Sequence, residues 1–117
     1  MLKLPPNTRI YLAVTPIDMR RSFDGLCAIV MEVLQQNPMD GHLFLFCGKG
    51  GNRMKALIWD RNGFVLWYKR LEKGRFKWPR SVVHSLSISE LELALLMDGI
   101  DFTKLKKLPV FKAQYAL

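Results

Sequence analysis

Aliphatic side chains recur at every second position of residues 8–14, TRIYLAV. A period of two is typical of a β-strand with one buried face. In residues 22–36 the apolar positions instead recur every three or four residues, which predicts a helix with a wide apolar stripe. Asn37-Pro38 ends this helix, because the residue before a proline avoids helical geometry. The first third of the chain therefore predicts a strand followed by a long helix.

The central segment predicts three strands. HLFLFC, residues 42–47, is apolar on both faces, as expected of a strand in the middle of a sheet. KALIWD and FVLWYKR flank Asn62-Gly63, a dipeptide strongly favoured in two-residue hairpin turns. With this dipeptide at the turn, Asp60 would pair with Val65, and the open end of the hairpin would be basic.

Two further elements follow this hairpin. Gly74 begins RFKW, whose alternation directs Arg75 and Lys77 to one side and Phe76 and Trp78 to the other. We expect this segment to be an edge strand with its aromatic side chains in the core. SISELELALLMDGI, residues 87–100, predicts a second helix, with a capping box from Ser89 to Glu92 and Gly99 after its C-terminus.

The order of these elements predicts an α+β fold in a single domain of residues 1–117. It should contain a mostly antiparallel sheet of four to five strands, one long helix packed on a face, and a second C-terminal helix. The second face of the sheet could be covered by the terminal helix, a second subunit or a ligand. The tail from about residue 102 could pack or could form a mobile arm.

Composition indicates a soluble protein of the cytoplasm. Half of the residues are hydrophobic, but no apolar run approaches the ~20 residues that span a bilayer. The sequence MLKLPPNTRI has no apolar signal-peptide segment. Cys27 and Cys47 lie in apolar surroundings without disulfide-framework spacing, so we expect two buried, reduced thiols. No membrane association is expected.

Candidate catalytic and metal-ligating residues form no recognisable set. The two cysteines, His42 and His84 lack zinc-ligand spacing, so we expect no metal site and no cofactor. A nuclease would need several carboxylates around metal ions. Asp18, Asp24, Asp60 and Glu72 each have a local structural explanation near a helix start, a turn or basic neighbours. We therefore predict that the protein is not an enzyme.

Charge is concentrated in one quarter of the sequence. Between residues 49 and 80 there are ten Lys and Arg against two acids, while the rest of the chain is balanced. Segregated charge of this kind favours binding to a polyanion, although a solvated loop region is the alternative. The candidate nucleic-acid-binding residues are Lys49, Arg53, Lys55, Lys69, Arg70, Lys73, Arg75, Lys77 and Arg80.

The glycine-rich segment CGKGGNR, residues 47–53, does not have the spacing of a P-loop. It also lies between two predicted strands, whereas a P-loop joins a strand to a helix. A hairpin connection is therefore the favoured interpretation, although its basic side chains and backbone N–H groups could still contact a phosphate.

Two stretches of the sequence are long and unusual. The first, P-x-D-M-R, contains Pro16, Asp18, Met19 and Arg20. The second, K-R-L-x-x-G-R-F-x-W-P, contains Lys69, Arg70, Leu71, Gly74, Arg75, Phe76, Trp78 and Pro79. In these stretches the chain resembles the TnpB accessory proteins of bacterial insertion sequences. These are the second-reading-frame products of insertion-sequence family sixty-six, distinct from the RNA-guided nuclease of the same name. Members often carry an arginine-rich run where this chain has residues 48–53, GKGGNR.

The resemblance implies an accessory role in DNA transposition and supplies no catalytic or binding residues. Together with the segregated charge, it favours a non-enzymatic protein that binds nucleic acid, DNA rather than RNA. The alternative is a protein-interaction module that docks on the transposase or another element-encoded protein, since the predicted sheet is apolar on both faces. A homo-oligomer is compatible with either hypothesis.

Overall fold

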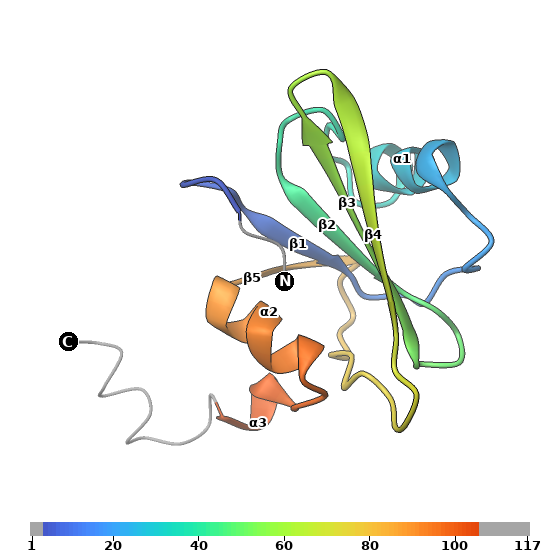
Figure 1. Ribbon diagram of the computed structural model, residues 1–117, viewed down its shortest axis with the longest axis vertical. Coiled ribbons are helices and arrows are strands. Elements are labelled where there is room, and N and C mark those ends of the chain that lie inside the picture. The colour runs from blue at the N-terminus through green and yellow to red at the C-terminus, as the bar shows by residue number, and fades with distance from the viewer. Residues whose placement is uncertain (1–3, 106–117) are drawn as a thin grey trace.

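The computed structural model describes residues 4–105 (Figure 1). Its elements, in chain order, are β1 (Ile10–Ala13), α1 (Phe23–Glu32), β2 (Leu43–Cys47), β3 (Arg53–Asp60), β4 (Gly63–Arg70), β5 (Ser85–Ile88), α2 (Glu90–Met97) and α3 (Phe102–Leu105). The strands form one mixed sheet in the order β4-β3-β2-β1-β5. Strands β1 and β2 are parallel and joined through α1, while the other neighbouring pairs are antiparallel. The predicted α+β class is confirmed.

Both faces of the sheet are covered within the described residues (Figure 1). Helix α1 packs on one face, where Leu26 and Val30 contact Phe44 and Phe46 in a fully buried cluster. On the other face, α2 and the segment around Phe76 cover the remaining apolar side chains of the central strands. The terminal helix therefore covers the face whose covering the sequence left open.

Helix α1 is shorter than the predicted span of residues 22–36. Its last turn closes with bonds from the N–H groups of Leu34 to the carbonyl of Ile29 and of Gln36 to that of Val30. Gln35 adopts a left-handed conformation, with φ of 55°. Residues 33–36, which the periodicity predicts to be helical, form this closing turn instead. Leu34 is nevertheless buried in the core, as its place in the apolar stripe predicts.

The predicted hairpin exists, but its register was wrong by two residues. Asp60 pairs with Gly63, so Arg61 and Asn62 form the turn. Arg61 takes the left-handed conformation, with φ of 53°. In this register Trp59 lies opposite Phe64, and their rings pack edge to face at 4.9 Å between centroids. A shift of two residues preserves the faces, because strand side chains alternate with period two.

The prediction of an edge strand at RFKW was also wrong. Residues 71–84 contain no strand, and the strand beside β1 is instead β5, in the serine-rich connection. The segment crosses one face of the sheet, where Trp78 Nε1 donates a hydrogen bond to the Ala13 carbonyl at 2.8 Å. The predicted sides of its side chains are confirmed, since Phe76 is buried while Arg75 and Lys77 are exposed.

Helix α2 begins with the predicted capping box. The Ser89 hydroxyl accepts a hydrogen bond from Glu92 N, and the Glu92 carboxylate accepts one from Ser89 N. Gly99 follows the helix with φ of 77°. Phe102 of α3 is buried, so the beginning of the predicted tail packs against the core, while residues 106–117 lie outside the described part of the chain.

Candidate nucleic-acid interface

The segment after β4 folds back onto the loop between β2 and β3. Leu71 N donates to the Asn52 carbonyl, and Phe76 N donates to the Gly51 carbonyl, both at 2.8 Å. The loop is a hairpin connection between antiparallel strands, as predicted. These bonds bring residues 48–53 and 69–76 to the same end of the sheet, at the lower right of Figure 1.

Gly51 lies where the two segments approach each other closely. It has φ of +82°, and a Cβ added there would lie 3.2 Å from Cδ of Arg75. The aliphatic stem of Arg75 therefore runs along the glycine, which holds this side chain beside the loop. The sequence predicts the hairpin connection, but it does not predict this approach of Arg75 to Gly51.

Five basic residues gather at this end of the sheet, here called the basic end: Lys49, Arg53, Arg70, Lys73 and Arg75. Arg53 and Arg70 are cross-strand partners. Arg70 also pairs with Glu72 at 2.9 Å. Within residues 4–105, the other four members are exposed and make no ion pair.

Asp18 flanks the basic end, where it lines an open hollow of about 490 Å³ together with Lys49 and Arg53. Arg20 donates from Nε and from its second terminal nitrogen to the Asp18 carboxylate, the shorter bond being 2.7 Å. These hydrogen bonds, with one from Arg20 N, hold the pKa of the Asp18 carboxyl well below its ordinary value. Asp18 is therefore ionised at neutral pH, and its charge is matched by Arg20.

Lys55 is not part of this surface, which corrects the sequence prediction. The side chain is only 6% exposed. Its ammonium donates to the carbonyls of Met19 and Arg21, each at 2.7 Å, and lies 5.0 Å from the centre of the Tyr68 ring. Lys55 thus ties the loop before α1 to strand β3 and cannot contact an external phosphate.

Lys69 is also directed away from the basic end. Its ammonium donates to the Met97 carbonyl at 3.1 Å, at the C-terminus of α2. A cation at this position interacts favourably with the helix dipole and satisfies a terminal carbonyl. Lys69 lies on the opposite face of β4 from Arg70, because side chains alternate along a strand. Its observed contact is therefore structural.

Lys77 and Arg80 lie next to the basic end and share a second hollow with Arg75. This hollow has a volume of about 550 Å³ and is also lined by Asp101 and Thr103. Thr103 donates a hydrogen bond to the Asp101 carboxylate, which lowers the pKa of Asp101. The hollow therefore contains one carboxylate among three basic side chains.

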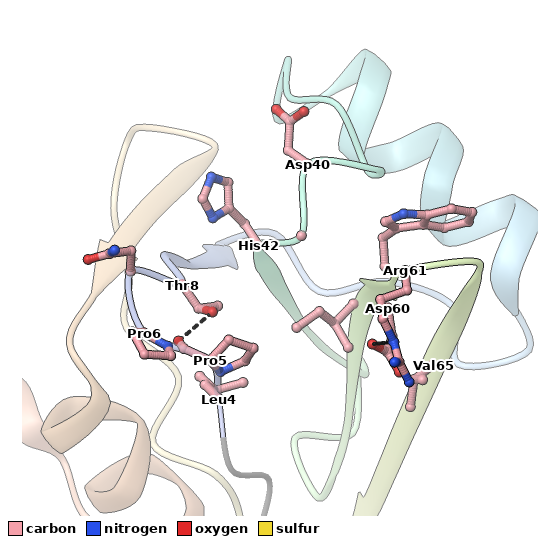
Figure 2. A pocket seen from close by; sticks show the side chains of 13 residues that line it. Leu4, Pro5, Pro6, Thr8, Asp40, His42, Asp60, Arg61 and Val65 are labelled. Carbon is pink, nitrogen blue, oxygen red and sulfur yellow. Dashed lines mark hydrogen bonds and ion pairs between the residues drawn. The ribbon is translucent and has the colours of Figure 1, made fainter.

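A third hollow lies at the opposite end of the β3–β4 hairpin and lacks an excess of basic side chains (Figure 2). Its volume is about 480 Å³, and Pro5, His42 and Val65 are among the residues that line it. Its one arginine, Arg61, pairs with Asp60 at 3.7 Å, and Asp40 adds a second carboxylate. Phosphate binding is not favoured here, because the charges do not sum to a positive field.

The cysteines are buried free thiols, as predicted. Burial raises the pKa of the Cys47 thiol to about 11. Across residues 4–105, no group of three or more His, Cys, Asp or Glu side chains could hold a metal ion. None of the helices in the described part of the chain has the length and hydrophobicity needed to cross a membrane.

Comparison with protein families agrees with the resemblance seen in the two motif stretches. The model of the family described as IS66 Orf2 like protein matches residues 8–107. The chain belongs to this family. Its members are accessory proteins associated with transposition, and the family is not known as one of enzymes.

Two relatives in this family come from Sinorhizobium fredii (strain NBRC 101917 / NGR234). Uncharacterized protein y4hO is 41% identical, and the match covers 87% of this chain and 89% of the relative. Uncharacterized protein y4jC is 38% identical, with 87% of each chain covered. No solved structure matches the chain.

Both stretches that carried the resemblance to the IS66 Orf2 like family meet at or beside the basic end. The first stretch supplies Asp18, which lines the same hollow as Lys49, and Arg20, which pairs with Asp18. The second supplies Arg70 and Arg75, together with Phe76, whose N–H bonds to the loop. Segments about fifty residues apart in the sequence thus lie together in the fold.

Proposed function

We propose that this IS66 Orf2 like protein assists transposition by binding DNA through the basic end, with the phosphate backbone as the group contacted. The observation that carries the proposal is the convergence of Lys49, Arg53 and Arg75, from the β2–β3 loop, β3 and the segment after β4, at one end of the sheet. Basic side chains grouped in this way neutralise phosphates and release counterions.

The arrangement of the arginines supports an anionic ligand. Arg53 and Arg70 are directly opposite on neighbouring strands, where like charges destabilise a sheet. Glu72 offsets part of this repulsion through its pair with Arg70. A phosphate between the guanidinium groups would offset the rest, because arginine binds phosphate with two parallel hydrogen bonds.

Phosphate contacts position a protein on DNA without reading its sequence. We therefore expect similar affinity for unrelated duplexes. Lys77 and Arg80 extend the proposed contact surface beyond Arg75, on the far side of Phe76. The aromatic side chains Phe76 and Trp78 take part in the core, so base stacking is not included in the proposal.

The proposal is tested by reversing charge at the basic end. Arg53→Glu/Arg75→Glu should weaken binding to a fluorescently labelled DNA duplex by at least about tenfold at low salt, because two phosphate contacts become repulsive. Arg9→Glu/Arg61→Glu is the matched control, since it makes the same change in net charge on exposed residues at the other end of the sheet. Equal loss of affinity in both variants would refute a localised interface.

The alternative function is docking on the transposase of the same element. This hypothesis needs an apolar face of the sheet that a partner could cover. Within residues 4–105, however, α1 covers one face, and α2 with the segment around Phe76 covers the other. Co-purification of the transposase that survives nuclease treatment and high salt, and that is unchanged by Arg53→Glu/Arg75→Glu, would favour this alternative over DNA binding.

A further inference from the structure

The two edges of the sheet differ in length and in chemistry. Strand β5 has four residues and carries two serines, Ser85 and Ser87. Strand β4 has eight residues and forms the other edge. Short or polar edge strands are a common protection against pairing with another chain, whereas long apolar edges favour it. Only β5 has this protection.

The outer edge of β4 offers backbone groups for another strand. No strand among the described residues pairs with it. On an edge strand every second residue directs its N–H and C=O outward, so a strand of this length can accept a full ladder. The register with β3 runs without interruption from Arg53–Arg70 to Asp60–Gly63, so no bulge twists the edge away.

The centre of β4 is apolar and uncharged. Residues 64–68 read FVLWY, with Val65 42% and Tyr68 47% exposed. The strand has no proline. The basic residues at its end are already engaged, because Lys69 donates to the Met97 carbonyl and Arg70 pairs with Glu72. Charged side chains on an edge strand commonly prevent its pairing with another chain. On β4 the charges of Lys69 and Arg70 are partly offset by these contacts.

We propose that β4 pairs in antiparallel fashion with β4 of a second copy of this chain, with the two-fold axis at Leu66. In this register Leu66 lies beside Leu66 of the second copy, Val65 beside Trp67, and Phe64 beside Tyr68. Every central pair is apolar, and aromatic or β-branched pairs of this kind stabilise antiparallel strands. An isologous interface must be self-complementary, and this strand meets that requirement.

Side-chain pairing favours this register over its neighbours. With the axis at Leu66, Lys69 and Arg70 fall beside Gly63 and the turn residue Asn62 of the second copy, neither of which is charged. With the axis at Val65, Lys69 would lie beside Arg61, which places two basic residues opposite each other. With the axis at Trp67, Lys69 and Arg70 would lie beside Val65 and Phe64, which places charged side chains opposite apolar ones.

The pairing would join the two sheets into one continuous sheet. A two-fold axis perpendicular to the sheet keeps both copies of α1 on the same face and directs the two basic ends to opposite ends of the dimer. The dimer depends on main-chain and apolar contacts of β4 and does not require DNA binding, so either proposal can fail without the other.

Sedimentation equilibrium of the nuclease-treated full chain, at roughly 0.5 M salt where electrostatic contacts are screened, tests the pairing. The expected mass is twice the monomer's 13.6 kDa. Val65→Lys should raise the dissociation constant of the dimer at least about tenfold, because two-fold symmetry introduces each lysine twice. Val83→Lys is the matched control, since Val83 is similarly exposed, at 49%, in the connection before β5.

A monomeric protein, or a dimer that Val65→Lys does not weaken, would overturn the proposal, whatever the DNA binding. The register has its own test. Leu66→Cys should give a covalent dimer with a short bifunctional thiol cross-linker, because directly opposed residues bring their Cβ atoms within about 4.5–5.5 Å. Val83→Cys should not, and the native cysteines are buried. A dimer in which Leu66→Cys forms no such link would overturn the Leu66-centred pairing.

Discussion

Lys55 carries its charge inside the fold. Its ammonium is held by the carbonyls of Met19 and Arg21 and by the face of the Tyr68 ring. A buried ammonium is tolerated when its hydrogen bonds are satisfied. These bonds fix the loop that carries Asp18 and Arg20, so one residue of the sheet determines where that loop lies relative to the basic end.

Removal of this side chain should therefore reduce stability. Lys55→Ala leaves two carbonyl groups without their charged donor and should lower the free energy of unfolding by about 2–3 kcal/mol. Urea denaturation monitored by tryptophan fluorescence measures the change. Arg53→Ala, two positions away and exposed, is the control and should change stability by no more than about 0.5 kcal/mol. Equal effects of the two substitutions would contradict the structural role of Lys55.

The sequence could not separate Lys55 from the exposed lysines. Alternation along β3 places Lys55 on the same face as Leu57 and Trp59. Whether a lysine on that face is buried depends on partners that the chain brings from elsewhere. The partners of Lys55 are carbonyls of residues 36 and 34 positions earlier in the chain. The sequence does not show which backbone carbonyls a lysine will meet. The charge count therefore included Lys55 and Lys69 among the candidate nucleic-acid-binding residues, although both bind carbonyls inside the fold.

At the scale of elements, the basic end depends on how the β2–β3 loop meets the segment after β4. Two backbone hydrogen bonds join them, and Gly51 lets the Arg75 stem approach. The loop is therefore a positioned element that holds Arg75 beside Lys49 and Arg53.

Alanine substitutions at Gly51 and Gly41 distinguish the effect of backbone strain from the effect of displacing the Arg75 side chain. Gly51 and Gly41 both have φ of +82°, but only at Gly51 would a new Cβ meet another residue, at 3.2 Å. Gly51→Ala and Gly41→Ala should each cost about 1–2 kcal/mol of stability, because alanine disfavours the left-handed region. Only Gly51→Ala should also weaken DNA binding, by several-fold. Equal DNA affinity in the two folded variants would contradict a positioning role for Gly51.

The elements with clear local signals were predictable. The capping box of α2 and the central strand β2 followed from periodicity and short motifs. The hairpin register did not, because Arg61 adopts the conformation expected of Asn62 or Gly63, and the packing of Trp59 on Phe64 accompanies that choice. The segment RFKW has the alternation of a strand, but it pairs with no strand in the described part of the chain. Phe76 N donates to the Gly51 carbonyl instead, and the Trp78 indole N–H donates to the Ala13 carbonyl.

At the scale of the whole molecule, the fold converts a charge bias along the sequence into a charged end. The positive segment runs from Lys49 to Arg80, yet two of its lysines are used internally, and Arg61 lies at the far end with Asp60. Family membership assigns the chain to transposition, and the convergence of the remaining basic residues supports the DNA-binding proposal. Neither composition nor motif spacing alone could distinguish the basic residues that gather at the basic end from those that are used elsewhere in the fold.

The most direct measurement is the dependence of DNA affinity on salt concentration. If the five side chains of the basic end each contact a phosphate, a plot of the logarithm of the association constant against the logarithm of salt concentration should have a slope of about −4 to −5. Arg53→Glu/Arg75→Glu should reduce this slope by about two, and Arg9→Glu/Arg61→Glu should leave it unchanged. A wild-type slope near zero, or no binding at low salt, would contradict DNA binding through the basic end.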